Sequence, residues 1–393
     1  MSELLEQVKQ NNPQLEQARQ VHKAAQASVP QATAWSNPMV GLIQQPIPSS
    51  PLRLGASQGF SYTLTQPFQL FGKKRLAGEI AQDQADAVGT QVVATEQQLA
   101  AQVKSTFYQL LAYQHQERIS QDNLQRLEQI KRISKVRYAN NAAAYVDYLN
   151  AQVAQSSAQN DLFALQRQID TTRQSLNILV GRDPHIPLEI SGTIPALSSQ
   201  MASLDEFATL TLKHNPTLQG TALQVSAAEK GVEYAKKAYL PDFQVIMTKI
   251  SDNPPWGLSG QSYGVELDLV LPTWFLEKER AGEDQARANL LANRAGDMSA
   301  RQQILLGVAS AYNTVLQARK QMEFIRDRQL PEAQTAWRLA MQNYATNNSQ
   351  AFADLLLAQT NLRTTELSLL QAESAAAQAW ASLEAAVGTE LKL

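Results

Sequence analysis

The amino-acid sequence predicts a mainly α-helical fold with a small β part, built from two copies of one plan. Three observations predict it: an ordered internal repeat, long helical stretches, and short runs in which apolar and polar residues alternate. The chain has 393 residues and no cysteine, which excludes disulfides, thiolate metal sites and cysteine nucleophiles. Its net charge of -2 lacks the basic surplus of nucleic-acid-binding proteins, so no nucleic-acid partner is expected.

The internal repeat is visible as matched motifs that keep their order along the chain. Asn12-Pro13 matches Asn215-Pro216 at an offset of 203 residues, and Val180-Gly181 matches Val387-Gly388 at an offset of 207. Two helical regions that merely share a composition would not explain the matched prolines, so the pattern indicates a duplication. The predicted parts are a first repeat at residues 1–181, a linker at 182–204 and a second repeat at 205–393.

Each repeat begins with Asn-Pro, an N-cap residue followed by proline at the first helical position. A helix of about 24 residues is expected to follow and to end before Pro38 or Pro241, because the residue before proline avoids the α region. Two strand-like runs come next, separated by a loop rich in Pro, Gly and Ser. The predicted strand pairs lie at about 38–68 and about 241–271.

A long helical hairpin completes each repeat. The first hairpin starts near Lys73 and contains no proline up to Tyr138, a length of roughly 100 Å at 1.5 Å per residue. This exceeds an ordinary globular domain and indicates a coiled coil or the wall of a helical barrel. In the second hairpin a joint or kink is expected at Pro331. The hairpin tips, rich in Asn, are predicted near 139–146 and 345–353.

The strand-like runs alternate most strictly in the last one, where Tyr263, Val265, Leu267 and Leu269 are apolar and Glu266 and Asp268 are polar. A run of about ten residues is also the length of a tilted membrane β-strand. Four strands cannot close a barrel within one chain, and an open sheet leaves exposed edges. Closure by several protomers removes these edges. The alternative is a small sheet packed on helices in a soluble protein.

Two further motifs carry a family resemblance. The run Gln66-Pro67-Phe68-Gln69-Leu70-Phe71-Gly72-Lys73-Lys74-Arg75 leads into a long helix, and each hairpin tip has a tyrosine followed by an aspartate, Tyr138 with Asp147 and Tyr344 with Asp354. With the paired Asn-Pro helix starts, these motifs make the whole chain resemble TolC-family outer membrane factors. Within that family the chain resembles most the heavy-metal efflux branch, which is CzcC- and CusC-like. Asn141 stands where the family has Gly.

The resemblance implies a homotrimer in the lipid of a Gram-negative outer membrane, extending into the periplasm. Four strands per chain would form a twelve-stranded barrel, and the antiparallel helical hairpins an α-barrel tunnel. The implied function is a passive efflux duct that docks onto a periplasmic adaptor protein and an inner-membrane RND-type pump or ABC exporter. A type I secretion duct and a soluble coiled-coil scaffold or membrane-remodelling protein are the alternatives.

No enzymatic activity, cofactor or metal site is expected. The chain has no Walker A, G-x-S-x-G or H-E-x-x-H motif, and none of its four histidines forms a close pair. The first residues, MSELLEQVKQNNPQ, lack the apolar region of a signal peptide. Taken alone, they indicate either a cytoplasmic protein or a mature chain whose targeting segment was removed, and the resemblance implies an outer membrane location.

The candidate functional residues lie in the hairpin tips and the strands. Asp147 and Asp354 follow the reversals at matched positions, where negative charge suits the start of a helix. The other interpretation is a gate at the mouth of the tunnel, with Arg137 and Arg338 as cationic partners. Asn141, Ala142, Asn347 and Ser349 are expected to contact the adaptor. Glu266 and Asp268 are expected to line the lumen, and Trp256 and Trp274 to lie in an aromatic girdle.

Overall fold

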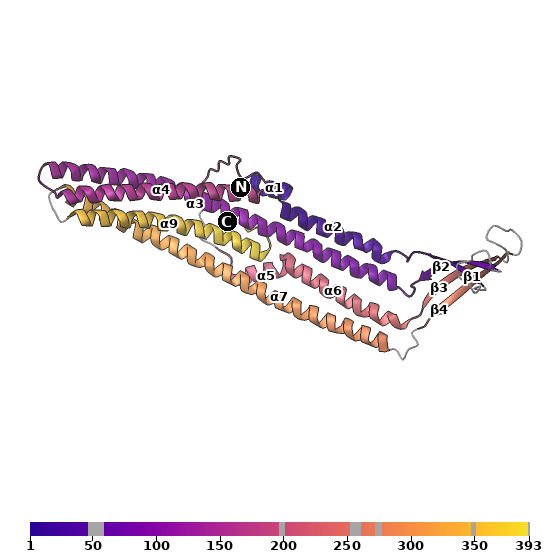
Figure 1. The fold of residues 1–393 in the computed structure, drawn as a ribbon. Helices are drawn as coiled ribbons and strands as arrows, with labels where there is room; N and C mark the ends of the chain where they lie inside the picture. Colours follow the sequence, from indigo (N-terminus) through magenta and orange to yellow (C-terminus); the bar gives the residue numbers. More distant parts are fainter. Residues whose placement is uncertain (46–58, 196–200, 252–260, 272–276, 347–350, 392–393) are drawn as a thin grey trace. The chain divides into compact units, whose positions relative to one another are not determined.

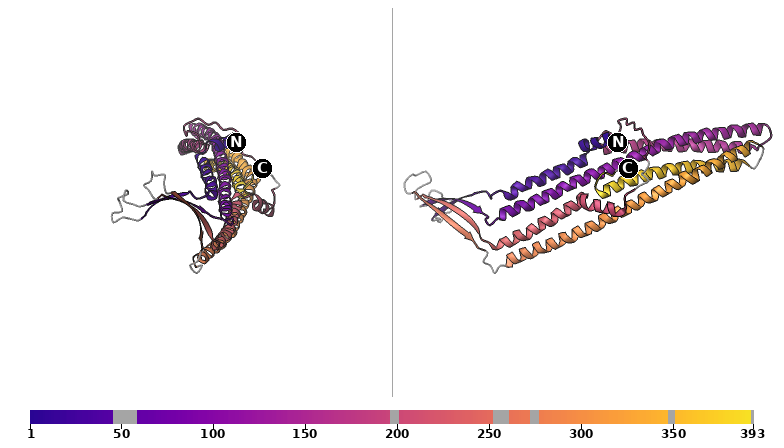
Figure 2. Two further views of the ribbon diagram at one scale, coloured as in Figure 1. Left: turned by 90° about the vertical axis from the view of Figure 1, so that its right-hand side faces the viewer. Right: turned by 180° about the vertical axis from the view of Figure 1, so that it is seen from behind.

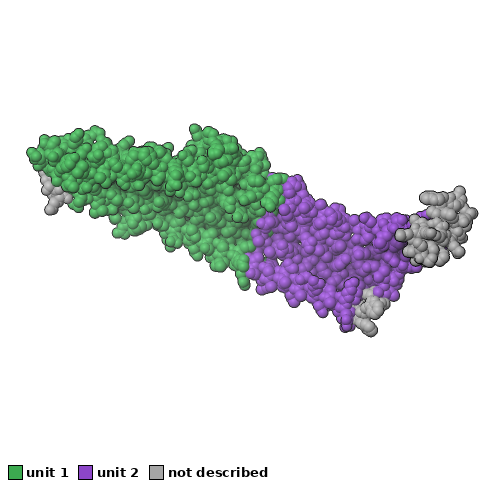
Figure 3. Space-filling view, in the orientation of Figure 1, with its two compact units in different colours: residues 1–18, 92–216, 301–393 green, residues 19–91, 217–300 purple. Residues whose placement is uncertain are grey.

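The computed structural model describes residues 1–45, 59–195, 201–251, 261–271, 277–346 and 351–391. Helices dominate this part of the chain, and four strands form one sheet (Figure 1). The chain divides into two compact units, drawn in green and purple in Figure 3. Unit 1 comprises residues 1–18, 92–216 and 301–393, and unit 2 comprises residues 19–91 and 217–300. Each unit therefore contains segments of both sequence repeats.

The described elements, in chain order, are α1 (Ser2–Asn11), α2 (Pro13–Thr33), β1 (Met39–Gln45), β2 (Gly59–Phe68), α3 (Lys73–Ala139), α4 (Tyr145–Leu179), α5 (Leu204–His214), α6 (Pro216–Lys236), β3 (Asp242–Ser251), β4 (Gln261–Val270), α7 (Glu277–Phe324), α8 (Leu330–Ala345) and α9 (Ala351–Val387). A short 3-10 helix, Lys237–Tyr239, follows α6. The predicted long helix is confirmed, because α3 is a single helix of 67 residues.

The four strands make one antiparallel sheet in the order β1-β2-β3-β4 (Figure 2). The central pair joins the two sequence repeats, with Thr63 of β2 opposite Thr248 of β3. The outer pairs, β1 with β2 and β3 with β4, are the hairpins expected within each repeat. Because β2 belongs to the first repeat and β3 to the second, both repeats contribute strands to the same sheet.

The joint expected at Pro331 is confirmed as a π-helical turn, Ile325–Gln329, between α7 and α8. Pro331 lies in the first turn of α8. Proline has no N–H to donate to the preceding turn, and its ring clashes with the carbonyl group four residues earlier. The wider π turn accommodates both effects without ending the helical rod.

The repeated Asn-Pro motifs do more than start helices in unit 1. The side-chain oxygen of Asn12 accepts hydrogen bonds from the backbone N–H groups of Gln14 and Leu15, as expected for an N-cap. Its amide nitrogen also donates to Leu179 O at 2.7 Å, at the end of the return helix α4. In the second repeat, Asn215 donates to Ala386 O at 3.0 Å. In both repeats, therefore, the asparagine before α2 or α6 forms a hydrogen bond to the end of the return helix, α4 or α9.

Gly181, which follows α4, is required by this junction. Its φ is +75°, and an added Cβ would lie 2.4 Å from Asn11 O. We expect Gly181→Ala to lower the free energy of unfolding by about 1–3 kcal/mol, because it combines a left-handed backbone with a steric clash. Chemical denaturation of the purified protein measures this. Gly231→Ala, at an open helical position, is the control and should be neutral or stabilising. Equal stability of the two variants would contradict the assignment.

Candidate functional site

The sheet of unit 2 has two chemically different faces. Residues that are directly opposite in the register share a face, and side chains alternate along each strand. One face is apolar and carries Val40, Leu42, Tyr62, Leu64, Phe68, Phe243, Val245, Met247, Tyr263, Val265, Leu267 and Leu269. The outer strands of this face are exposed: the exposed fraction is 80% for Val40, 77% for Val265 and 66% for Leu267. An apolar surface of this extent is typical of a site that contacts lipid or another protein.

Among the residues of this face whose side chains the structure describes, two are polar, and both have partners. The Gln66 amide donates to Ser36 O at 2.8 Å and to Pro67 O at 3.1 Å. The Lys249 ammonium lies 6.0 Å from the ring centroid of Tyr263, in a cation–π arrangement. Aromatic rings lie toward both ends of the face. Tyr62 and Tyr263 flank Lys249 near one end, and Phe68 lies opposite Phe243 at the other end.

The opposite face of the sheet carries the polar residues Ser61, Thr63, Thr65, Gln244, Thr248, Glu266 and Asp268, together with the apolar residues Met39, Ile43, Pro67, Ile246, Ile250 and Val270. Asp268 accepts a hydrogen bond from the Gln244 side chain at 2.7 Å. Glu266 lies two residues away on the same strand and is exposed. Both candidate lumen residues are thus on the polar face. Trp256 and Trp274, expected in a girdle, lie outside the described residues.

The second candidate site is the reversal between α3 and α4 in unit 1. Asn141 adopts a φ of 55°, the left-handed conformation that the sequence predicts for a tight turn at this Asn. The reversal is closed by backbone hydrogen bonds from Ala142 N to Arg137 O at 2.8 Å and from Asn141 N to Tyr138 O at 3.0 Å. Asn141 is exposed and Ala142 half-buried. Asn347 and Ser349, the matched residues of the other tip, lie outside the described residues.

Arg137 is the buried cation of this tip, with 8% of its surface exposed. Its guanidinium group donates to the backbone carbonyls of Tyr344 and Ala142, and it lies 4.7 Å from the centroid of the Tyr344 ring. The sequence predicts a carboxylate partner for Arg137. The structure instead directs its hydrogen bonds to carbonyl oxygens of two different hairpins, so the residue ties α3 to α8.

Tyr344 anchors the same cluster and is fully buried. Its hydroxyl group donates to Ser134 Oγ at 3.1 Å, and its ring packs against Phe352 with centroids 5.5 Å apart. Burial raises the pKa of the Tyr344 hydroxyl. Tyr138 occupies the matched position in the first repeat but is exposed. The pattern of repeated tyrosines therefore did not reveal that Tyr344 is buried whereas Tyr138 is exposed.

The two acidic candidates differ in their surroundings. Asp147 is in the first turn of α4, where burial raises the pKa of its carboxyl group and the charge of Arg137 opposes that rise. Asp354 is exposed in the first turn of α9. Arg338 is exposed on α8. Among the described residues, neither Asp354 nor Arg338 forms an ion pair within one chain.

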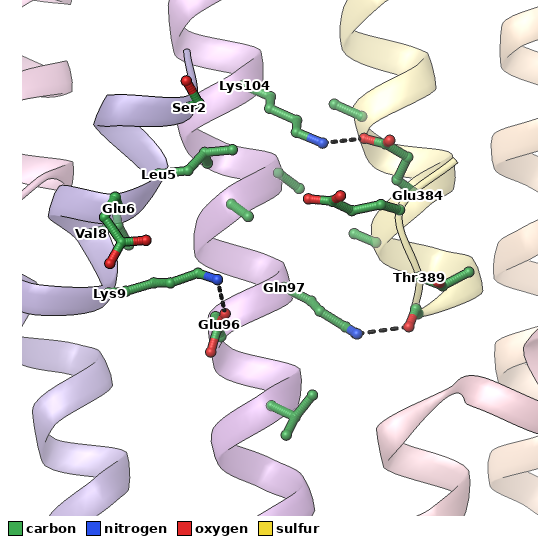
Figure 4. A pocket seen from close by; sticks show the side chains of 17 residues that line it. Ser2, Leu5, Glu6, Val8, Lys9, Glu96, Gln97, Lys104, Glu384 and Thr389 are labelled. Carbon is green, nitrogen blue, oxygen red and sulfur yellow. Dashed lines mark hydrogen bonds and ion pairs between the residues drawn. The ribbon is translucent and has the colours of Figure 1, made fainter. Parts of the chain in front are cut away.

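A cavity of about 450 Å³ in unit 1 lies between α1, α3 and the end of α9 (Figure 4). Two ion pairs cross it, Lys9 with Glu96 at 3.0 Å and Lys104 with Glu384 at 2.6 Å. The Glu96 carboxylate raises the pKa of Lys9. The first ion pair connects α1 with α3, and the second connects α3 with α9.

Within the described ranges, no helix is both long enough and apolar enough to span a bilayer. No group of three or more His, Asp or Glu side chains in this part of the chain is arranged to hold a metal ion.

Comparison with known proteins gives one family and one fold. The family model for outer membrane efflux proteins matches residues 4–182 and 208–389, once for each predicted repeat. No curated protein matches significantly in sequence. The solved structure of the outer-membrane channel OprN superposes with a TM-score of 0.84 at 18% identity, covering 99% of this chain and 90% of that chain.

Two other solved structures have the same fold. The outer membrane protein VceC from Vibrio cholerae gives a TM-score of 0.82 at 17% identity, covering 99% of this chain and 96% of that chain. CusC gives a TM-score of 0.83 at 16% identity, covering 99% of this chain and 92% of that chain. These similarities confirm the predicted mainly helical fold with its small sheet and internal repeat.

Proposed function

Because this chain belongs to the outer membrane efflux protein family, we propose that it is the outer membrane channel of a tripartite efflux system. In this proposal it is a passive duct that carries substrate from the periplasm to the exterior. The observation that carries the proposal is the exposed apolar face of the sheet, backed by a polar face that includes Glu266 and Asp268. A sheet with these two faces suits lipid on one side and water on the other.

The four-stranded sheets of three copies of the chain would together close into one barrel, which a single sheet cannot do. In the described residues, β1 and β4 are the edges of the sheet, and an exposed edge pairs readily with another strand. Pairing β4 of one protomer with β1 of the next would leave no free edge, with the apolar faces turned to lipid and the polar faces to the lumen. The implied trimer matches the family resemblance found in the sequence.

The helical tips are proposed as the periplasmic mouth. Asn141, Ala142, Asn347 and Ser349 would contact a periplasmic adaptor protein, which in turn joins an inner-membrane RND-type pump or ABC exporter. Asp354 is exposed and forms no ion pair with another described residue of its own chain. Around a threefold axis it would face two equivalents, and such charges repel unless cations or arginines of neighbouring protomers offset them. We assign Asp354, with Arg338 as a partner from another protomer, to the gate.

Substitution of Asp354 tests the gate. Asp354→Ala should raise the conductance of the isolated trimer in a planar bilayer, because the closed tip loses its bridging charge. Asp147→Ala should act more weakly, since Asp147 is half-buried beside Arg137 within its own chain. Single-channel recording with and without divalent cations measures both effects. If Asp354→Ala leaves the conductance and its cation dependence unchanged, the gate assignment fails and Asp354 serves only the start of its helix.

A further inference from the structure

The turns that join the sheet to the helices in unit 2 carry an unusual group of cations. Seven basic residues lie at the starts of α3 and α7, at the end of α6 and in the 3-10 helix that follows it: Lys73, Lys74, Arg75, Lys236, Lys237, Lys278 and Arg280. Two of them are neutralised by carboxylates, Lys73 by Asp242 at 2.7 Å and Arg75 by Glu79 at 2.5 Å. None of the ion pairs formed within the described residues includes Lys74, Lys236 or Lys237.

Lys74 and Lys237 are nevertheless held in place. The Lys74 ammonium donates to Ala34 O at 2.6 Å, and the Lys237 ammonium donates to Phe71 O at 2.7 Å. A carbonyl oxygen fixes the position of an ammonium group without cancelling its charge. Each ammonium has three donors, so donors remain for an anionic ligand. Lys236, next to Lys237, is exposed and adds a third positive charge.

The two carbonyl groups that hold these lysines belong to Ala34 and Phe71, next to aromatic contacts at one end of the apolar face. Ala34 precedes Trp35, whose ring contacts the ring of Phe68 with centroids 5.4 Å apart. Phe71 contacts Phe243 with centroids 6.1 Å apart. Phe68 and Phe243 both belong to the apolar face. Trp35 and Phe71 are about half exposed, at 51% and 46%. The ammonium groups of Lys74 and Lys237 are therefore bonded to the backbone of Phe71 itself and of the residue before Trp35, two aromatic residues that contact the apolar face.

We propose that Lys74, Lys236 and Lys237 form a binding site for the phosphate of an anionic phospholipid in the periplasmic leaflet. Its acyl chains would lie along Phe71, Trp35 and the apolar face of the sheet. The site rests on the proposed function, since it requires that face to contact lipid. Cations next to interfacial aromatics and an apolar surface complement a lipid in both its charged head and its hydrocarbon tail.

Lipid retention by the assembled protein tests the site. The protein is purified in detergent and incubated with phosphatidylglycerol or with zwitterionic phosphatidylcholine, and retained lipid is counted by native mass spectrometry. Wild-type protein should retain phosphatidylglycerol in preference to phosphatidylcholine. Lys74→Gln with Lys237→Gln should weaken phosphatidylglycerol binding about thirtyfold at low salt, from the roughly fivefold that one lysine near a membrane surface contributes.

Matched variants separate charge from folding. Lys236→Gln removes a side chain that has no hydrogen bond in the described part of the chain, so it should weaken binding about fivefold without affecting the fold. Lys74→Arg with Lys237→Arg keeps the charge and should retain the lipid. Lys135→Gln with Lys320→Gln, on exposed positions of unit 1, should have no effect. Equal retention by wild-type protein and the Lys74/Lys237 glutamine variant, or equal retention of both lipids by wild type, overturns the site.

A planar-bilayer recording of the same preparations distinguishes the two proposals. If the wild-type protein conducts but the glutamine variants retain phosphatidylglycerol normally, only the lipid site is wrong. If the wild-type protein neither assembles nor inserts into lipid, the proposed function and the lipid site both fail.

Discussion

Leu267→Arg is expected to prevent most of the protein from completing its fold in a bilayer. Leu267 lies in β4 between Val265 and Leu269, on the apolar face, and 66% of its surface is exposed in one chain. If this face contacts lipid, the arginine must place a charge near the middle of the membrane, at a cost of about 2–4 kcal/mol in each protomer. A trimer incurs that cost three times.

Urea titration of protein folded into phospholipid vesicles measures the loss of stability. Glu266→Arg is the matched control, since it puts the same side chain at nearly the same depth but on the polar face. The control should still assemble, and the added positive charges should shift ion selectivity of the channel towards anions. If Glu266→Arg abolishes folding while Leu267→Arg is tolerated, the facing of the strand is opposite to the one proposed.

Arg137→Met is expected to open the helical tip. The guanidinium group connects the carbonyls of Ala142 and Tyr344 and stacks on the Tyr344 ring. Hydrogen bonds from a charged donor contribute about 1.5–3 kcal/mol each, and methionine of similar length replaces none of them. The α3–α4 reversal should therefore lose about 3–6 kcal/mol of local stability. As a result, the isolated channel should show a several-fold higher conductance.

Hydrogen exchange of the backbone amides around the α3–α4 reversal, together with single-channel recording, measures both consequences. Arg132→Met is the control, because Arg132 is an exposed arginine of the same helix and lies little more than one turn from Arg137. It should leave exchange and conductance at wild-type values. Unchanged protection and conductance in Arg137→Met would show that the tip is held by apolar packing around Tyr344 alone.

Local chemistry made most of the fold predictable. The start of α2 at Pro13 and of α6 at Pro216 follows from Asn-Pro as N-cap and first helical residue. Both helices are 21 residues long, slightly shorter than expected, and end before Pro38 and Pro241, although α2 also contains Pro30. Strict alternation predicted β4, and Pro331 predicted the joint, although a π turn accommodates the proline. In each case the signal lies within a few residues of the element that it specifies.

The candidate sites depended on contacts between distant segments, which a single sequence does not contain. Arg137 and Tyr344 are 207 residues apart, and nothing in either local motif indicates their hydrogen bond. The repeat does not indicate this contact either, because the residue of the second tip that corresponds to Arg137 is Asn343. Likewise, no local motif around Lys74 or Lys237 indicates that their ammonium groups bind the carbonyl oxygens of Ala34 and Phe71, 40 and 166 residues away. The pump class and the heavy-metal branch stay predictions from the resemblance.

The mass of the assembled protein tests most directly the claim that several chains close one barrel. Purified protein in detergent or in lipid nanodiscs is measured by native mass spectrometry at concentrations that span the micromolar range. The proposal predicts a stable species of three chains, each of 43.3 kDa, that conducts ions when transferred to a planar bilayer. A stable monomer in detergent or lipid would contradict it, because the two edges of the sheet, β1 and β4, would then remain unpaired by any other chain.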